Sequence, residues 1–524
     1  MNRLAYITHW VLALLVGVCL TACTFHEEWD ASPVPEGDSY LRLHLTFSNG
    51  TPSTRAAKPE GDEDGDGREG AHFNENNIYN ICFFIYNDGG NLFTNADPLT
   101  PIKYSGYVGG LTLTGASSYT TAPIKIKSYT PVAGDRIIVL ANVGNLTGSY
   151  TTVGQLQNAE IARSAVWGAS TKIKDYNMFA MSSCTDDATY GKVDDTPEGS
   201  YANPFTANVE IERIAARVDW VLPLNASSQP DLDANGAKYS VSETGTAGTM
   251  YITDIRIVND AVTNTYLIRR TAPTIGGTQT YMGKQTVDSG TKLPEGYVIT
   301  PTSAAKGTET TYGTWFGASK FSDSKNAASF FSGTTYKVYD NANSTPDRFS
   351  VDGNWCYTIG YTMENTMAYT VQNNNLRTGL LLKSVFVPEM VYTCASVGAT
   401  PAAASYTKGD DFWYYEDKLD RTKSMFFLTE SDFDNYANGK SIYDYQKHHY
   451  VGGVCYYYIW IKHAGCNNPA LEGTYPMEYA IVRNNIYRIQ VETVLSIGTP
   501  TPEFTKEAIR VRKWNKRVHP EILL

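Results

Sequence analysis

The chain has 524 residues, of which 42% are hydrophobic and 19% charged, so it is long enough for several domains and can bury their cores. Its 37 Tyr and 43 Gly, with abundant Thr, Ser and Asn, are typical of strands joined by polar turns and disfavour long helices. The net charge of −11, with no clustered Lys or Arg face, disfavours nucleic acid as a partner, because phosphates reward positive charge.

The N-terminal residues carry the pattern of an export signal. Arg3 precedes an apolar run at residues 11–20, and small residues lead from that run to Cys23. This pattern predicts a signal peptide over residues 1–22 and lipidation of the Cys23 thiol after cleavage. A single transmembrane anchor over residues 4–22 is the alternative, which the short apolar run disfavours.

A candidate strand and an open tether follow the lipidation site. Leu41, Leu43, Leu45 and Phe47 alternate with polar residues, which predicts a strand with one buried face. Residues 50–76 combine low hydrophobicity with an acidic, glycine-rich run, and such a segment stays solvated and accessible to proteases. One strand is therefore expected to be joined to the rest of the chain through a cleavable tether.

Apolar runs separated by turn residues predict strands throughout the remaining chain, at residues 78–86, 136–143, 209–220, 251–258, 355–362, 380–387, 456–461 and 486–494. Short helices are expected near residues 153–162 and 430–438. A polar stretch at residues 225–248 places the expected boundary between an N-terminal domain (56–225) and a C-terminal domain (226–524). We predict an all-β fold of two β-sandwich domains with few short helices.

The C-terminal segment is a further strand candidate. Ile509, Val511 and Trp514 provide apolar positions, and the intervening Arg510 and Arg512 require that only one face be buried. A final segment of this kind can complete its own sheet or the sheet of a neighbouring molecule.

Catalytic and metal-binding motifs are not convincing anywhere in the chain, so we expect no enzyme activity and no cofactor. Neither a Gly-x-Ser-x-Gly nor a His-Glu-x-x-His motif occurs. Residues 62–67 fit the first half of a calcium loop, but Phe73 stands where a bidentate Glu is needed. His448, His449 and His463 lack a fixed ligand spacing, which favours surface histidines over a metal site.

Two further features leave alternatives open. The aromatic residues 412–415 have the chemistry to stack on sugar rings, although a core strand or an interface is the favoured interpretation. The six cysteines outside the leader include no Cys-x-x-Cys pair. Some of them can pair in an oxidising compartment, Cys455 and Cys466 being closest in sequence, and buried free thiols are equally consistent with the spacing.

Several of these segments together resemble the fimbrillin family of Bacteroidales. The lipidation site, the strand after it and Thr54-Arg55-Ala56 resemble the precursor region of that family. The most specific block resembles the C-terminal domain of minor-type, Mfa-like fimbrillins, which are related to the FimA-like major fimbrillins. That block comprises residues 477–487, 498–502 and 511–514. The resemblance implies transthyretin-like β-sandwich domains.

The resemblance also implies a route of assembly. The precursor would reach the outer membrane as a lipoprotein, and an Arg-specific surface protease would cut after Arg55, leaving Ala56 as the mature N-terminus. Arg68 is the rival site. The cut would remove a lipidated propeptide (residues 23–55) together with its plug strand, whose buried face is Leu41, Leu43, Leu45 and Phe47.

A neighbouring subunit's C-terminal donor strand, with Ile509, Val511 and Trp514, would then fill the groove. Repetition of this contact builds an open polymer, because the contact is head-to-tail and does not close. The implied partners are other fimbrial subunits, including tip and anchor proteins, and the implied location is an adhesive fimbria on the cell surface. The alternatives are a fimbrial tip adhesin, an anchor subunit that keeps its lipid, and a surface glycan-binding lipoprotein.

Overall fold

The chain is represented by a computed structural model, which describes residues 38–47, 75–93, 95–114, 118–168, 178–183, 191–241, 246–272, 280–281, 297–298, 300, 315–332, 336–338, 348–351, 354–366, 376–463, 479–502, 509–512 and 515–517. Over these residues the fold is all-β, which confirms the predicted fold class. No helix in these ranges has the length and apolar character needed to cross a membrane.

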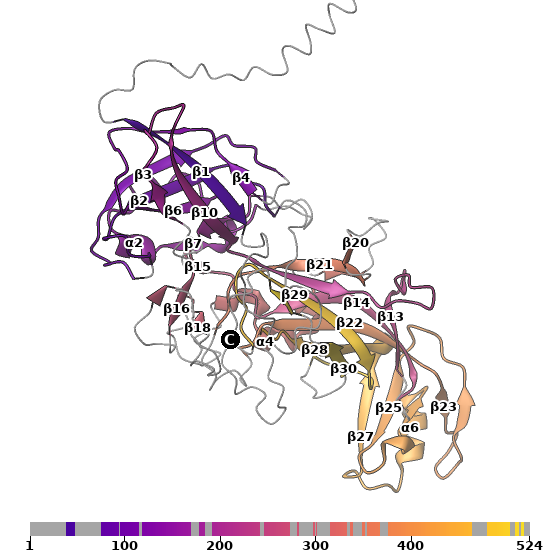
Figure 1. Cartoon of the computed structure of the whole chain (residues 1–524). Helices are drawn as coiled ribbons and strands as arrows, with labels where there is room; N and C mark the ends of the chain where they lie inside the picture. The colour runs from indigo at the N-terminus through magenta and orange to yellow at the C-terminus, as the bar shows by residue number, and fades with distance from the viewer. Residues whose placement is uncertain are drawn as a thin grey trace, which may run out of the picture.

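A nine-stranded sheet forms the N-terminal part of the molecule, at the upper left of Figure 1. Its main path runs β3-β2-β6-β8-β10-β1-β4, with β5 paired to β1 and β9 paired to β10. The strands are β1 (Ser39–Phe47), β2 (Ile81–Tyr86), β3 (Ile102–Val108), β4 (Ser118–Thr120), β5 (Ile124–Ile126), β6 (Arg136–Ala141), β8 (Met181–Ser183), β9 (Val193–Asp194) and β10 (Phe205–Arg213).

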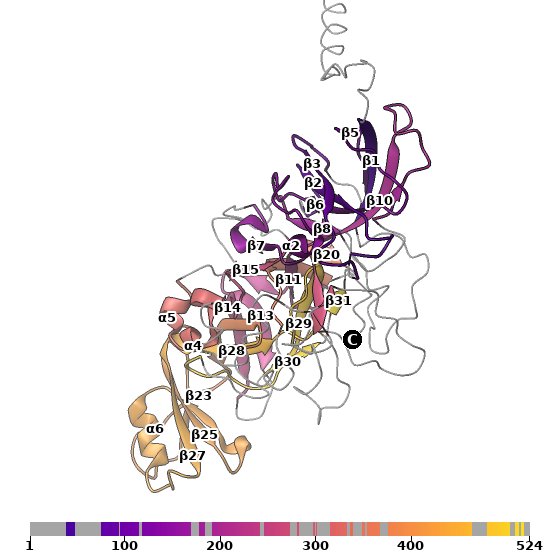
Figure 2. The ribbon, with the colours of Figure 1, turned by 90° about the vertical axis from the view of Figure 1, so that its left-hand side faces the viewer.

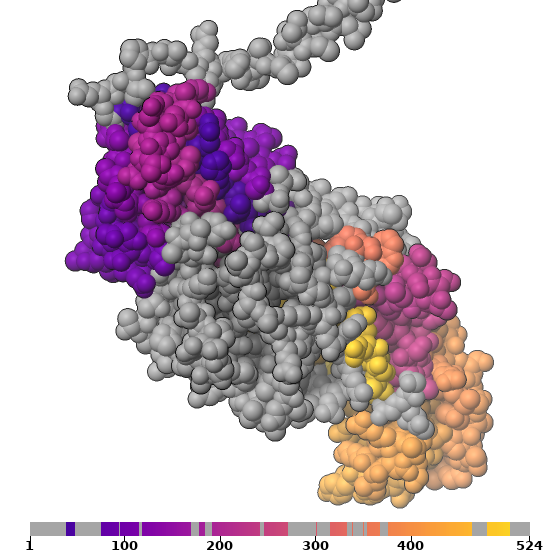
Figure 3. Space-filling model, viewed as in Figure 1, coloured from indigo at the N-terminus to yellow at the C-terminus, as the bar shows by residue number. Residues whose placement is uncertain are grey.

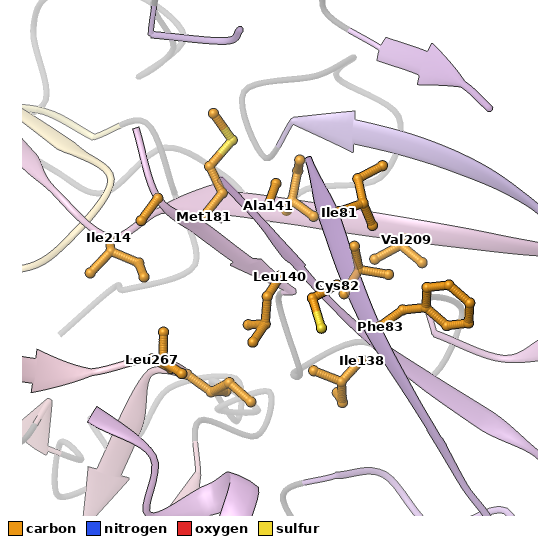
Figure 4. Close-up of a cluster of buried hydrophobic side chains, with 14 of the residues drawn as sticks. Ile81, Cys82, Phe83, Ile138, Leu140, Ala141, Met181, Val209, Ile214 and Leu267 are labelled. Atoms are coloured by element: carbon orange, nitrogen blue, oxygen red, sulfur yellow. The ribbon is translucent and has the colours of Figure 1, made fainter. Parts of the chain in front are cut away.

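The core of this part is built by strands that are apolar on both faces. Every residue of β2 is buried, as are five of the six residues of β6, its antiparallel partner. Figure 4 shows side chains from these strands, including Cys82, Phe83 and Leu140, packed with Met181 and Val209 from β8 and β10. Continuous apolar runs such as 81–86 are expected for strands covered on two sides.

A twelve-stranded sheet forms the centre of the C-terminal part. Its main path runs β20-β21-β11-β29-β13-β14-β22-β28. The strands are β11 (Ala216–Val221), β12 (Leu232–Asp233), β13 (Gly236–Val241), β14 (Gly248–Val258), β19 (Tyr336–Lys337), β20 (Arg348–Val351), β21 (Asn354–Thr362), β22 (Gly379–Pro388), β28 (Val454–Trp460), β29 (Asn485–Val494), β30 (Ile509–Arg512) and β31 (Asn515–Arg517).

The prediction of a single long strand over residues 209–220 is wrong in one respect, because the segment forms two strands. β10 ends at Arg213 and pairs with β1, β8 and β9, whereas β11 begins at Ala216 and pairs with β21 and β29. Both halves have strand patterning, so the sequence pattern runs on while the chain changes sheet at residues 214–215. The division into domains at residues 225–226 stays a prediction.

A third sheet forms a lobe that projects from the C-terminal part at the lower right of Figure 1, and Figure 2 shows the same projection from the side. Its order is β24-β23-β26-β25-β27, and α6 packs on it. The elements are β23 (Val391–Thr393), β24 (Ala402–Ala404), β25 (Phe412–Asp417), β26 (Met425–Phe427), α6 (Glu430–Ala437) and β27 (Tyr445–Tyr450).

The remaining elements are short. They are α2 (Val153–Gln157), β7 (Glu160–Ala162), β15 (Asn264–Tyr266), β16 (Arg270–Ala272), β17 (Thr280–Tyr281), β18 (Tyr297–Val298), α4 (Phe321–Ser324), α5 (Ala327–Phe330), and the 3-10 turns Arg163–Ala165, Gly317–Ser319, Arg421–Lys423 and Val451–Gly453. The predicted helix at 430–438 is confirmed as α6, whose N-cap Thr429 accepts the Asp432 amide at 3.1 Å. The helix predicted at 153–162 is shorter, because β7 begins at Glu160 and pairs with β15.

Candidate functional site

β1 has an unusual position in the N-terminal sheet, because it comes before the predicted tether in sequence yet lies inside the sheet. It pairs in parallel with β10, from Leu41 opposite Phe205 to Phe47 opposite Ile211. On its other edge it pairs antiparallel with β4 and β5. Figure 3 shows β1, in indigo, at the surface between the magenta and purple atoms of its neighbours.

The two faces of β1 differ as the alternation predicts. The side chains of Leu41, Leu43 and Leu45 are fully buried and that of Phe47 is 2% exposed, all within the N-terminal core. Arg42, His44 and Thr46 on the other face are only partly buried. If β1 were removed, the core would therefore lose four apolar side chains, and β10 would lose a partner strand.

Main-chain and side-chain hydrogen bonds hold β1 along both edges. The Leu43 amide donates to Thr121 Oγ1 at 3.0 Å, and the Thr121 amide donates back to the Leu43 carbonyl at 2.9 Å. At the start of the strand, the Tyr40 amide donates to the Gly199 carbonyl at 2.8 Å. Because backbone groups prefer to stay paired, an empty groove here would attract another strand.

Asp38 fixes the entry of the chain into β1. Its carboxylate accepts the Ser128 amide at 2.7 Å and lies 3.4 Å from Lys125 Nζ. The Ser128 amide, followed by Lys125, holds the pKa of Asp38 below its usual range. The carboxylate is therefore charged over the whole neutral range and marks the N-terminal limit of the paired strand.

The expected processing and lipidation residues lie outside the described residues. Cys23, Arg55, Ala56 and the rival Arg68 all belong to this group. Glu75 and Asn76, the last two residues of the segment expected to stay solvated, are only 2% and 7% exposed, so the expectation is wrong for these two residues. Glu75 lies where the two large sheets meet, in contact with residues of β11 and β21.

Glu75 belongs to an ion cluster buried at this junction. Its carboxylate accepts Arg217 Nη1 at 3.0 and 3.1 Å and the Tyr361 hydroxyl at 2.7 Å. Arg217 Nε also donates to Asp219 Oδ1 at 3.1 Å, and Arg488 Nη2 donates to Asp219 Oδ2 at 3.2 Å. Burial, reinforced by the Glu75 carboxylate, raises the pKa of Tyr361 well above its ordinary value, so Tyr361 acts as a neutral donor.

A second arginine ties Glu75 and Asn76 to the C-terminal part. Arg213, the last residue of β10, donates to the Glu75 carbonyl at 3.2 Å and to Asn76 Oδ1 at 2.6 Å. The same guanidinium donates to Asn484 Oδ1 at 2.9 Å, just before β29. These hydrogen bonds fix Glu75 and Asn76 against the end of β10 and the residue before β29.

These clamping residues were not identified as functional from the sequence. Arg213, Arg217 and Asp219 are charged residues in an otherwise apolar segment. This pattern was the signal in the sequence that could have identified them. Buried charges need paired partners, so a strand carrying them implies a partner surface of opposite charge. Only the tertiary structure shows that Glu75 supplies it.

The C-terminal segment lies on its own sheet in this monomer. β30 pairs antiparallel with β29, with Val511 opposite Val491 and Ile509 opposite Val494, and β31 pairs with the beginning of β29. Trp514 lies outside the described residues. The segment thus has strand conformation and a sheet partner, and it would have to leave β29 in order to enter another molecule.

The three histidines considered as metal ligands do not lie together. His448 bonds Glu416 at 3.0 Å and His449 bonds Asp411 at 3.1 Å, both on the projecting lobe, whereas His463 is buried beside the Tyr487 hydroxyl. In the part of the chain that the structure describes, no three His, Cys, Asp or Glu residues form a group able to hold a metal ion.

The aromatic run at residues 412–415 is mostly core. Phe412, Tyr414 and Tyr415 are buried, and Trp413 stacks on His449 with ring centroids 4.2 Å apart. Such residues offer little surface to a sugar ring. Among the cysteines, Cys82, Cys394 and Cys455 are buried free thiols, and Cys466 lies outside the described residues.

Comparison with known proteins identifies one matching family model. Residues 448–518 match the C-terminal region of fimbrillin, described as the type IV major fimbrial subunit protein. No curated protein matches the sequence.

Solved structures with a similar chain path include three fimbrial proteins. The tip fimbrial protein Mfa3 of Porphyromonas gingivalis, with a C-terminal truncation, is 10% identical, and the alignment covers 91% of this chain and 98% of that one at a TM-score of 0.34. The fimbrilin FimA of Porphyromonas gingivalis W83 is 13% identical over 91% and 98%, at 0.34. A fimbrial assembly protein of Parabacteroides distasonis is 9% identical over 67% and 99%, at 0.24.

Proposed function

The chain carries the C-terminal region of the fimbrillin family at residues 448–518, and from this premise we propose that it is a structural subunit of a cell-surface fimbria. In this proposal the chain is exported as a lipoprotein precursor acylated at Cys23. Cleavage after Arg55 removes the lipid and the plug strand, and a neighbour's C-terminal strand replaces β1. The role is structural and not catalytic.

The observation that carries the proposal is the internal position of β1. A strand that precedes a cleavable tether is held between β10 and the β4–β5 edge, with its four apolar side chains at most 2% exposed. Removal of this strand by proteolysis would leave an apolar groove between β10 and the β4–β5 edge. Such a position suits a strand that another subunit's strand later replaces.

The energetics favour replacement of β1 over an empty groove. Burial of four apolar side chains contributes about 6–12 kcal/mol at about 1.5–3 kcal/mol each. Each main-chain hydrogen bond adds about 1 kcal/mol. The cost of association, on the order of 4–15 kcal/mol, offsets part of this gain, so a donor strand must fill the groove well.

The Glu75 cluster would keep the two large sheets joined after cleavage of the precursor. Arg213 and Arg217 hold Glu75 and Asn76 against the second sheet, so release of residues upstream does not free the junction. The two large sheets stay joined through buried ion pairs, which suits a subunit that transmits force along a fibre. Arg483 bound to Glu364 at 2.8 Å adds a second buried pair between the loops beside this junction.

Cleavage-site variants test the proposal. The Arg55→Ala precursor should stay uncut and monomeric, whereas the matched Arg68→Ala precursor should be cut before Ala56 and give an oligomer ladder on unheated denaturing gels. N-terminal sequencing of surface filaments reports the site directly. If Arg55→Ala still polymerises with Arg68 uncut, release of the plug strand is wrong. Lipid on Cys23 of the assembled form would instead favour the anchor alternative.

A further inference from the structure

The place occupied by β1 specifies the pattern that a replacing strand must have. Its four buried positions, at Leu41, Leu43, Leu45 and Phe47, alternate with positions that are only partly buried. Successive side chains of a strand point to opposite faces, so a replacing strand needs four apolar side chains at alternate positions. A charged side chain at any of the four would be buried in an apolar core, which is costly.

One set of alternate residues in the C-terminal segment has this pattern. Among residues 503–524, four alternate apolar side chains occur at Val518, Pro520, Ile522 and Leu524. Every other set of four in this range includes a charged residue; the set that begins with Ile509 and Val511 continues to a lysine. Residues 518–524 lie outside the described residues. They are the part of the C-terminal segment whose side chains match the four buried positions.

The proline in this set restricts how the segment can lie beside β10. Proline has no amide hydrogen, so inside a sheet it loses one ladder hydrogen bond. Leu43 lies between the ladders of β5 and β4, and its amide donates to a side chain, Thr121 Oγ1, at 3.0 Å. Its carbonyl accepts the Thr121 amide at 2.9 Å, a bond that a proline can also accept. A proline at the Leu43 position would therefore leave both ladders intact.

The tolerance of the Leu43 position selects the direction of the replacing strand. If the segment ran in the direction of β1, Pro520 would take the place of Leu43. In the opposite direction it would take the place of Leu45, which pairs with Tyr119 in the β4 ladder. The Leu45 amide points to the same edge as that of Leu43, because amide direction alternates along a strand, so a proline there would remove a ladder bond.

We propose that residues 518–524 of a second copy of this chain replace β1 and run parallel to β10, with their four apolar side chains in the four buried positions. The inference rests on the proposed function and adds the segment and the register of the exchange. In this register Glu521 takes the place of His44, whose ring lies 3.0 Å from the Thr120 hydroxyl. That hydroxyl can donate to a carboxylate.

The proposed segment fills the core less completely than β1 does. Val518 and Pro520 have smaller side chains than the leucines they replace, and Leu524 has a smaller side chain than Phe47. Buried positions that are underfilled lose packing contacts. The segment of a second copy therefore does not displace an intact plug strand, and exchange requires that β1 be removed first.

Competition by peptides tests which segment is exchanged. Full-length precursor is treated with an Arg-specific protease in the presence of an excess of one of two peptides of equal length, residues 515–524 or residues 507–516. The oligomer ladder is read on unheated denaturing gels. The peptide of residues 515–524 should suppress the ladder, and the peptide of residues 507–516 should leave it unchanged. Because the peptides are added to the natural chain, no substitution can unfold the acceptor.

Variants of the full chain test which side chains are buried. Ile522→Asp should weaken the ladder at least about tenfold, because it places a carboxylate in the apolar core. The matched control is Leu523→Asp, whose side chain would point away from the core and which should keep the ladder.

A cross-link tests the direction of the strand. In the parallel register residue 523 takes the place of Thr46, which is paired with Ser118 of β4. A precursor with Ser118→Cys, cut in the presence of peptide 515–524, should form a disulfide with the peptide that carries Leu523→Cys and not with the one that carries His519→Cys. The reverse result would overturn the assigned register.

The outcomes separate this inference from the proposed function. Suppression of the ladder by residues 507–516, by neither peptide, or equally by both would overturn the assignment of residues 518–524, while the ladder itself would still support strand exchange. An equal loss of the ladder in Ile522→Asp and Leu523→Asp would overturn the assigned buried face. Absence of a ladder from the cut parent without peptide would refute the proposed function and this inference together.

Discussion

Shortening one buried side chain of the plug strand should allow the uncut precursor to accept a donor strand. Leu43 is fully buried at the middle of β1, and Leu43→Ala removes three side-chain carbons from the N-terminal core. A buried Leu→Ala change costs about 2–5 kcal/mol. At a factor of ten for each 1.4 kcal/mol, the open groove should become populated about 30- to 4,000-fold more often.

The assay measures capture of a donor peptide. A fluorescently labelled peptide with the sequence of residues 507–524 is added to uncut full-length precursor, and its capture is followed by anisotropy and on unheated denaturing gels. The Leu43→Ala precursor should capture the peptide faster by a factor in the calculated range, because opening of the groove precedes entry of the peptide.

The control is Arg42→Ala, one residue away on the partly exposed face of the same strand. It keeps the buried face intact and should capture the peptide at the parental rate. Equal rates for Leu43→Ala and Arg42→Ala would refute the reasoning that burial of the β1 apolar face keeps the precursor latent. A circular dichroism spectrum matching the parent shows that each variant is folded.

Three further outcomes are expected. Glu75→Gln should lower the free energy of unfolding in urea by about 3–5 kcal/mol, because it leaves Arg217 without part of its buried partner, whereas Glu389→Gln at an exposed position should change little. The His448 hydrogen bond holds the pKa of Glu416 below its ordinary 4.5, so the stability that this carboxylate contributes is present at neutral pH and is lost as the pH falls below that value. The melting temperatures of the parent and Glu416→Gln should therefore differ at pH 7 and converge towards pH 3, and a constant difference would contradict the assignment. Burial raises the pKa of the Cys455 thiol to about 12, so this thiol should resist alkylation at pH 8 until denaturant is added, as read by mass spectrometry.

Local patterning was sufficient to locate the long buried strands of the two large sheets and one short helix of the lobe. The alternation at Leu41 to Phe47, the continuous apolar run before Tyr86 and the short helix expected near residues 430–438 each became the predicted element within a few residues. In the two strands the signal is carried by residues close in sequence, because side-chain direction alternates along a strand.

The sequence by itself determined that the fold is all-β, that residues 41–47 form a strand with one buried face, and that the C-terminal block is fimbrillin-like. Only the tertiary structure decided that β1 lies between β10 and the β4–β5 edge, that the strand pattern at 209–220 belongs to two sheets, and that Glu75 meets Arg217. The physical reason is range: hydrophobic periodicity specifies which face of a strand is buried, but it does not specify its partner. Pairing across 142 residues, as between Glu75 and Arg217, depends on where the whole chain places two buried charges that must neutralise each other.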